Sequence, residues 1–234
     1  MLKIALDGPS GAGKSSLAKE IAKRLGITYL DTGALYRTVG LAAKLQGVDP
    51  ADADQVGKML SVITVRVELE NGSQVVYLDG EPVGDRIRTP EMSMYASKVS
   101  AIPAVRAFLL DTQRDFARRN PVIMDGRDIG TVILPDADVK FYVTVDPTER
   151  ARRRLNELLA KGIETTLDEV LADMKARDLA DSTRAVAPAV KAPDAIELDN
   201  TGDFVETVER ALAIIRERTK RISTKARTSI LQAS

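Results

Sequence analysis

Short apolar runs alternate with longer helical patterns along most of this chain. The runs are Ile4–Leu6, Ile27–Leu30, Val122–Met124, Lys140–Val145 and Ala195–Leu198. Each has the length and composition of a buried strand, and the segments between them carry apolar residues at helical spacing. This order predicts an α/β fold in which helices cover both faces of a five-stranded parallel sheet.

One stretch breaks this alternation. Apolar and charged residues alternate at 65–70, as in a half-exposed strand, and Asn71-Gly72 and Asp79-Gly80 mark turns on either side of a second apolar run. The pattern predicts a small antiparallel meander at about residues 62–84, which is too small to be stable alone. It is either a mobile subdomain on the neighbouring helices or a decorative loop, and the sequence favours neither.

Capping signals mark two later helices. Asp146-Pro147-Thr148-Glu149 is typical of a helix start with proline at its first position, and Thr166 with Glu169 opens the next helix. The last helix begins at about Asp203, and its periodicity is lost from Arg221, where we expect fraying.

The first apolar run leads into a phosphate-binding loop. The sequence GPSGAGKS matches the pattern GxxxxGK[ST], and the apolar stripe of a helix follows it. Glycines let backbone N–H groups wrap around an anion, and the helix N-terminus adds partial positive charge. Because strand, loop and helix are all present, a nucleoside triphosphate site with Mg²⁺ is favoured over a chance match. The residues expected to bind ATP here are Gly8, Pro9, Ser10, Gly11, Ala12, Gly13, Lys14, Ser15 and Ser16.

Composition narrows the chemistry further. The chain has 234 residues, 44% hydrophobic and 29% charged, with zero formal net charge and no Cys or His. Thiolate chemistry, histidine general-base catalysis and histidine-ligated metals are therefore excluded, and no basic excess points to nucleic acid. With no apolar run of membrane-spanning length and no signal peptide, we expect a cytoplasmic protein.

Two charged loops follow predicted strands on the edge where ligands bind in open α/β sheets. The first is DTGALYR, which begins at Asp31 and Thr32 and ends at Arg37. The second is DGRDIGT, which begins at Asp125. A helix N-cap is the alternative interpretation of Asp31 or Thr32. Asp125, with Ser15, could hold Mg²⁺ directly or through water, and either Ser15 or Ser16 could be the hydroxyl ligand.

Two arginine-rich segments complete the pattern. Arg150–Thr166 contains four arginines, including Arg153, and could close over ATP as a lid or form a solvated helix face. Farther on, Arg177 and Asp181 share a helix face by their i, i+4 spacing, as an active-site pair or a surface ion pair.

Taken together, GPSGAGKSS, DTGALYR, DGRDIGT and the RD…D..RAVAP cluster resemble the bacterial cytidylate kinases over most of the chain. The resemblance implies the fold of P-loop nucleoside monophosphate kinases, with the meander inserted in the NMP-binding subdomain and a helical lid. It also implies a monomer that acts on ATP and CMP or dCMP with Mg²⁺. The implied CMP-binding residues are Thr32, Arg37, Ser97, Arg106, Arg127, Asp128, Arg177, Asp181 and Arg184, and the implied catalytic residues are Lys14, Arg127, Asp128 and Arg184.

Each implied role suits the chemistry of its residue. The Asp128 carboxylate can accept a hydrogen bond from the exocyclic amine of cytosine, and Ser97 and Arg106 can donate to ring acceptors. By the resemblance, Arg37 and Arg127 hold the α-phosphate, Arg177 and Asp181 bind the ribose, and Arg184 lies near the transferred phosphate.

Three alternatives remain. A UMP or dTMP kinase is disfavoured by the base-reading set, because a uracil carbonyl would face the Asp128 carboxylate. A GTPase switch is disfavoured because no asparagine is followed by lysine, as its guanine motif requires. A scaffold without catalysis is disfavoured by the intact Lys14 and arginines.

The expected division of the chain is core at 1–36, NMP-binding subdomain at 37–105, core at 106–149, lid at 150–168, core at 169–224 and a frayed tail at 225–234.

Overall fold

The structure is a computed structural model that describes residues 1–160 and 162–232, with side chains to residue 220. Residue 161, in the expected lid, and residues 233–234, in the expected frayed tail, lie outside the described part. Within it, the central feature is a parallel sheet with strand order β2-β6-β1-β7-β8. Its strands are β1 (Lys3–Asp7), β2 (Thr28–Asp31), β6 (Val122–Gly126), β7 (Val139–Thr144) and β8 (Ile196–Asp199).

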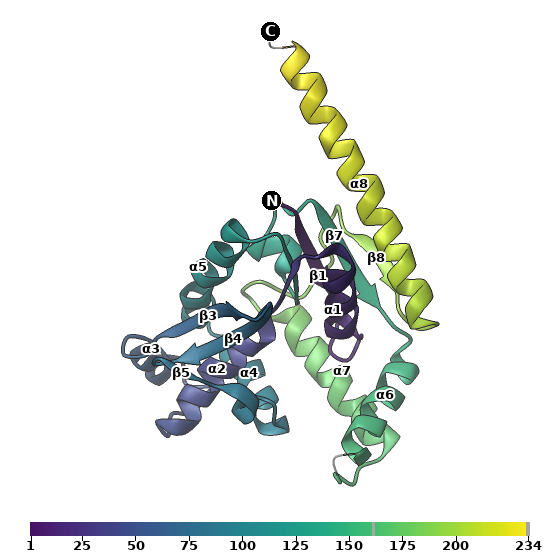
Figure 1. Cartoon of the computed structure of the whole chain (residues 1–234). Coiled ribbons are helices and arrows are strands. Elements are labelled where there is room, and N and C mark those ends of the chain that lie inside the picture. The colour runs from purple at the N-terminus through teal and green to yellow at the C-terminus, as the bar shows by residue number, and fades with distance from the viewer. Residues whose placement is uncertain (161, 233–234) are drawn as a thin grey trace.

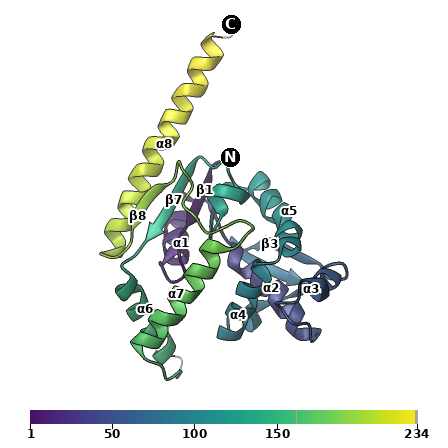
Figure 2. The same cartoon turned by 180° about the vertical axis from the view of Figure 1, so that it is seen from behind.

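Helices cover both faces of this sheet (Figures 1 and 2). Alternate side chains of β1 point to opposite faces, so Ile4 and Leu6 pack against α1 (Lys14–Leu25) and α8 (Phe204–Gln232), whereas Ala5 joins a core with α5 (Pro103–Arg119). The three inner strands, β1, β6 and β7, are buried on both faces, which is why each appears in the sequence as a nearly continuous apolar run. The predicted α/β fold is therefore confirmed.

The meander forms a second, antiparallel sheet in the order β3-β4-β5. Asn71 and Asp79 both adopt positive φ, followed by Gly72 and Gly80, as tight hairpin turns require. The buried side of this sheet shares one hydrophobic core with the helices around it. The elements of this lobe are α2 (Thr32–Leu45), α3 (Ala53–Leu60), β3 (Val65–Glu70), β4 (Ser73–Leu78), β5 (Glu81–Pro82), the 3₁₀ turn η1 (Gly84–Ile87) and α4 (Pro90–Ser100).

A helical pair, α6 (Pro147–Ala160) and α7 (Leu167–Thr183), lies across from this lobe (Figure 1). Asp146 accepts from the amides of Thr148 and Glu149 at the start of α6, and Thr166 with Glu169 forms a reciprocal capping box at the start of α7. A short π-helical segment, η2 (Ile129–Ile133), follows β6. At the end of the chain, α8 continues to Gln232 and projects beyond the body (Figure 1).

Candidate active site

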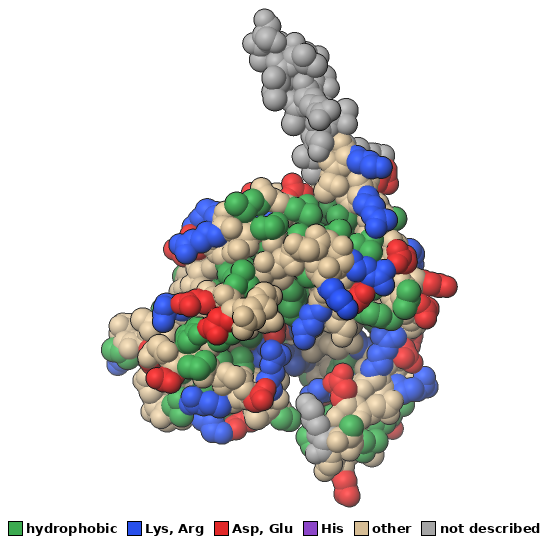
Figure 3. Space-filling model, viewed as in Figure 1, with side chains coloured by type: hydrophobic (Ala, Val, Ile, Leu, Met, Phe, Trp, Pro, Cys, Tyr) green, Lys and Arg blue, Asp and Glu red, His purple; other side chains and the backbone are tan. Residues whose placement is uncertain are grey.

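The carboxyl ends of β1, β2 and β6 open into a cavity of about 800 Å³. It lies between the meander lobe and the α6–α7 pair, where the surface is hollowed and rimmed by basic side chains (Figure 3). The predicted site residues that line it are Ser10, Gly11, Lys14, Ser15, Thr32, Arg37, Ser97, Arg106, Asp125, Arg127, Asp128, Arg177, Asp181 and Arg184.

The phosphate-binding loop forms one wall. Gly8, Gly11 and Gly13 all have positive φ, and a Cβ on Gly8 would lie 2.3 Å from the Val143 carbonyl oxygen of β7. Lys14 Nζ is buried and donates to the Pro9 carbonyl oxygen at 2.6 Å. Burial, and then the neighbouring Arg127 guanidinium, hold the pKa of Lys14 well below its ordinary value. An anion in the loop would relieve that penalty.

A buried asparagine clamps the loop from behind. Asn200, directly after β8, donates from Nδ2 to the Ala12 carbonyl oxygen at 2.9 Å. A Cβ on Gly13 would lie 2.5 Å from that nitrogen, so Gly13 is required here for space as well as for its φ. Asn200 also donates its backbone N–H to the Thr144 carbonyl at 2.8 Å. The loop is thus tied to the strand ends beside it.

A carboxylate and two hydroxyls face the end of the loop. Ser15 Oγ donates to Asp125 Oδ2 at 2.7 Å, and the Tyr29 hydroxyl donates to Asp125 Oδ1 at 2.9 Å. Burial, and then the nearby Asp31, raise the pKa of Asp125. Ser15 lines the cavity, whereas Ser16 does not. Ser15 and Asp125 therefore offer adjacent hard oxygen donors, which fit Mg²⁺ completed by water and phosphate oxygens.

The opposite wall holds a buried cluster of opposite charges. The Arg106 guanidinium donates to Asp128 Oδ2 and to the Ser100 carbonyl, and lies 5.5 Å from the centre of the Tyr36 ring. Arg184 Nη2 lies 3.5 Å from Asp128 Oδ1. Arg106 and Asp128 are 7% and 4% exposed, so the pair is almost free of water. Ser97, on α4, lines the same cavity.

The remaining arginines of this wall differ in their partners. Arg37 donates to Asp31 Oδ2 at 2.7 Å, and Arg127 Nε donates to Asp181 Oδ2 at 3.0 Å. Asp181 thus pairs with Arg127, and within the described residues no ion pair joins it to Arg177, although both lie on one face of α7. The Arg177 Nε is buried without a hydrogen-bond partner. Burial, and then Arg127, lower the pKa of Arg177.

Arginines of α6 reach three different places. Arg153 donates to the carbonyls of Asn200 and Thr201 at 3.1 and 3.0 Å, and it is not among the residues that line the large cavity. Arg154 does line that cavity and pairs with Glu157 at 3.0 Å. Arg150 is buried and donates to Asp178 of α7. These three arginines therefore do not act as one cluster.

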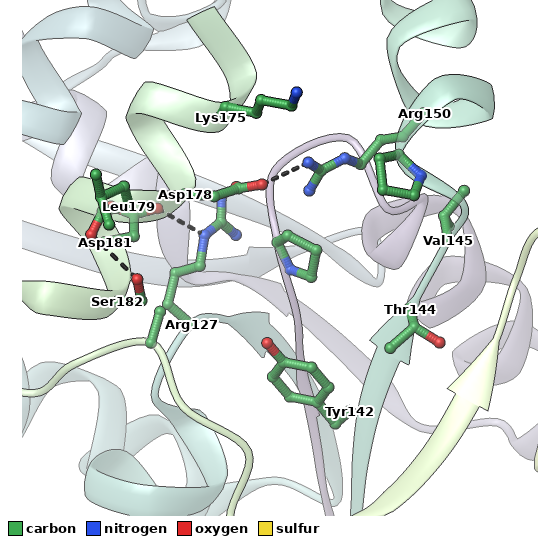
Figure 4. Close-up of a pocket in the computed structure, with 13 residues that line it drawn as sticks. Arg127, Tyr142, Thr144, Val145, Arg150, Lys175, Asp178, Leu179, Asp181 and Ser182 are labelled. Carbon is green, nitrogen blue, oxygen red and sulfur yellow. Dashed lines mark hydrogen bonds and ion pairs between the residues drawn. The ribbon is translucent and has the colours of Figure 1, made fainter. Parts of the chain in front are cut away.

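A second cavity of about 540 Å³ lies between α7 and β7 (Figure 4). Arg127 and Asp181 line both cavities, so their ion pair forms part of the partition, and Pro9 of the loop forms another part. Figure 4 shows Arg150 reaching toward Asp178 on α7, with Tyr142 on the opposite side. The acidic partners in this region are thus already engaged by arginines.

The two walls meet at Asp7. This buried residue ends β1, and its two carboxylate oxygens accept from the amides of Ile129 and Gly130 at 2.8 and 2.7 Å. Burial raises the pKa of Asp7 to about 6, against the lowering effect of those two hydrogen bonds. Asp7 therefore ties the start of the phosphate-binding loop to the segment after Asp128.

Sequence reasoning missed Asn200 and Tyr29. Arg150 and Arg154 belong to the arginine-rich segment that the sequence predicts as a lid, but their separate positions did not follow from the sequence. Nothing in the local sequence distinguishes Asn200 or Tyr29, because their partners Ala12 and Asp125 lie far away in the chain.

No helix in the described part of the chain is long and apolar enough to span a membrane.

The family model described as cytidylate kinase matches residues 4–217. The chain is 47% identical over 217 residues to a cytidylate kinase of Fervidobacterium nodosum, covering 92% of this chain and 97% of that protein. It is also 47% identical over 218 residues to a cytidylate kinase of Geobacter sulfurreducens, covering 93% and 94%. A solved structure of an uncharacterized protein from Eubacterium ventriosum, 14% identical, shares the fold with a TM-score of 0.50 over 92% of this chain and 99% of that one.

Proposed function

The chain belongs to the cytidylate kinase family and is a kinase, and from that premise we propose that it transfers the γ-phosphoryl group of ATP to CMP or dCMP, giving ADP and the diphosphate. The observation that carries the proposal is the cavity of about 800 Å³, which has the phosphate-binding loop on one wall and the Arg106–Asp128 cluster on the other. Two nucleotides could then meet with their phosphates between the walls.

The acceptor base would be read by the buried cluster. The Asp128 carboxylate can accept a hydrogen bond from the exocyclic amine of cytosine while Arg106 and Ser97 donate to ring acceptors. Uracil carries a carbonyl in place of that amine, so it would face a carboxylate that has no proton to donate. Burial of Arg106 and Asp128 supports discrimination, because an unmatched polar group is costly where water is excluded.

The phosphates would lie among the cations between the walls. Lys14 and the loop amides would hold the β- and γ-phosphates of ATP, and Arg153 would lie beside its base at the Asn200–Thr201 turn. Arg37 and Arg127 would grip the acceptor phosphate, Arg177 and Asp181 would bind the ribose, and Arg184 would lie near the transferred phosphate. Ser15 and Asp125 would hold Mg²⁺, which supplies charge neutralisation when bound.

This reaction needs little covalent help from the protein. The acceptor is already an anionic phosphate, so no general base is required, in keeping with a chain that has no histidine. Phosphoryl transfer depends on alignment and positive charge, which the arginines supply. Closure of the segment 150–168 over ATP would exclude water and suppress wasteful hydrolysis. We propose the segment 37–105 as the matching acceptor-binding subdomain.

Steady-state rates with ATP, Mg²⁺ and each of CMP, dCMP, UMP and dTMP test the proposal. We expect kcat/KM for CMP or dCMP to exceed that for UMP by about a hundredfold or more, the cost of about 3 kcal/mol for a mismatched buried polar group. Comparable rates with UMP or dTMP would instead favour the alternative nucleoside monophosphate kinases. ATP hydrolysis without an acceptor would contradict the transfer itself.

A further inference from the structure

One side chain of the meander is hydrogen-bonded to the backbone of Asp31 in the active-site wall. Gln74, on β4, accepts at Oε1 from the backbone N–H of Asp31 at 2.7 Å and donates from Nε2 to the Asp31 carbonyl at 3.2 Å. Asp31 ends β2, and β2 is the outermost strand of the parallel sheet. The Gln74 amide thus fills the hydrogen-bonding place of a missing neighbouring strand and fixes the backbone of Asp31.

The Asp31 side chain is fixed as well. Its Oδ1 accepts from the Ala34 amide at 3.0 Å and caps α2. Its Oδ2 accepts from Arg37 at 2.7 Å and pairs with Arg88 at 3.4 Å. Arg88 directly follows the meander and η1. Two residues of the inserted segment therefore contact Asp31: Gln74 binds its backbone, and Arg88 pairs with the carboxylate that also holds Arg37.

We propose that the meander is a positioning element for the acceptor-phosphate subsite, with Gln74 acting through Asp31 on Arg37. The inference rests on the proposed function, in which Arg37 grips that phosphate. Without Gln74, the junction of β2 and α2 loses its only described lateral hydrogen bonds to the meander. Asp31 is then held less firmly, and the Arg37 guanidinium that it binds varies more in its orientation toward the phosphate. Gln74 is then a positioning residue, since it lines neither cavity.

The meander is also held in place by buried side chains other than Gln74. Val65, Val76 and Leu78 are buried in the hydrophobic core of the lobe and hold the small sheet in place. Truncation of Gln74 therefore removes two hydrogen bonds to Asp31 and leaves that core intact. This separation makes the proposal testable in the folded, full-length chain.

Gln74→Ala is the main variant, and we expect KM for CMP to rise about three- to tenfold, the worth of one or two neutral hydrogen bonds. KM for ATP and kcat should stay within twofold. Gln74→Glu keeps an acceptor for the Asp31 N–H but places a carboxylate oxygen against the Asp31 carbonyl, so its KM for CMP should rise at least as much as in Gln74→Ala. An equal rise in both KM values, or no rise, would overturn the proposal.

Arg88→Gln and Arg66→Gln form a matched pair, because both arginines are exposed, at 55% and 57% of the side chain, and both pair with an acid. Arg66 pairs with Glu68 inside the meander, whereas Arg88 pairs with Asp31. We expect a rise in KM for CMP of about twofold for Arg88→Gln, as for an exposed ion pair, and none for Arg66→Gln. Equal effects in the two variants would contradict a path through Asp31.

Two further measurements test the path itself. In an Arg37→Ala background, Gln74→Ala should add no further loss of CMP affinity; a full additional loss would contradict action through Arg37. Hydrogen exchange in the ligand-free protein should be faster at residues 31–37 in Gln74→Ala, and unchanged protection there would overturn the proposal. Failure of the wild-type protein to bind CMP would count against the proposed function. The hydrogen-exchange measurement needs no nucleotide, so it tests the path from Gln74 to Arg37 in either case.

Discussion

The two walls of the cavity are built in different ways. The donor wall is one continuous stretch, residues 8–16, whose conformation follows from three glycines with positive φ. The acceptor wall gathers side chains from Thr32 to Arg184, contributed by α2, α4, α5, the end of β6 and α7. Lys14 on the donor wall bonds to a carbonyl oxygen, whereas Arg37, Arg106 and Arg127 on the acceptor wall each bond to a carboxylate.

This difference shows how the binding groups of each wall are held in position before a ligand binds. A loop of glycines and amides is preorganised by local backbone geometry and can accept an anion without rearrangement. Arginines on separate elements need partners to hold them, and the carboxylates serve that purpose. A phosphate that binds to Arg37 must then share this guanidinium with Asp31 or displace the carboxylate from it. The same holds for Arg127 and Asp181. The acceptor wall is consequently where we expect positioning residues to matter most.

Lys14→Met offers the largest effect and tests whether the donor wall works through charge. We expect kcat to fall about 10²- to 10³-fold, as for loss of a preorganised electrostatic contact to the transition state. KM for CMP should change little, because the acceptor wall is intact. Single-turnover kinetics measures the chemical step directly, and an unchanged rate would refute the assignment of the phosphate-binding loop.

Asp7→Asn tests the role of Asp7, which connects the two walls, through the pH dependence of the free energy of unfolding. The folded protein keeps a proton on Asp7 up to about pH 6, whereas the ordinary value for an aspartate is 3.8. As pH rises from about 4 to 6, the unfolded chain therefore releases this proton first, and the free energy of unfolding falls by up to about 3 kcal/mol. Above about pH 6 the penalty is constant.

Denaturant unfolding of wild type and Asp7→Asn across pH 4–7 isolates this effect, because other groups titrate equally in both. The stability of wild type relative to the variant should fall across that window. The asparagine cannot accept from both amides, which adds an offset that is independent of pH. A relative stability that is flat or rises with pH would contradict a buried, proton-retaining Asp7.

Asp128→Asn tests the acceptor wall. The amide can donate where the carboxylate accepts, so KM for CMP should rise about 10- to 100-fold and the preference over UMP should shrink. KM for ATP should stay nearly constant. Calorimetric titration with ATP and with CMP separates these outcomes; loss of ATP affinity would show that Asp128 is wrongly assigned to the acceptor.

Asn200→Asp gives the smallest expected change and asks whether the donor wall also needs a remote clamp. The aspartate has the same shape but cannot donate to the Ala12 carbonyl, so KM for ATP should rise about fivefold to tenfold. KM for CMP should be unaffected.

Thr207→Val is the matched control for Asn200→Asp. Thr207 is fully buried, and its hydroxyl donates to the Asp203 carbonyl at 2.9 Å and lies 3.5 Å from the Asp199 carbonyl, whereas none of its described hydrogen bonds reaches the phosphate-binding loop. The control should lower the melting temperature without changing KM for ATP. If both variants raise KM for ATP equally, the Asn200 effect is one of general stability.

Several features could be predicted because their physical cause lies within a few residues. The five strands appeared as apolar runs within two residues of their bounds, and the meander turns at Asn71 and Asp79 followed from residues that tolerate positive φ. The pairing of Asp181 illustrates the limit. Helical spacing brought it onto the face of Arg177, but its ion pair is with Arg127, which follows a distant strand.

The sequence by itself determined the α/β fold, the phosphate-binding loop and the set of charged residues at the strand ends, because periodicity and glycine conformation are local properties. Only the tertiary structure decided which carboxylate holds which arginine, that Ser15 faces Asp125, and that Gln74 and Asn200 brace the two walls. Apart from Asp31 and Arg37, which are six positions apart, those contacts join residues tens to nearly two hundred positions apart. Such partners are selected by packing in three dimensions, which no local pattern encodes.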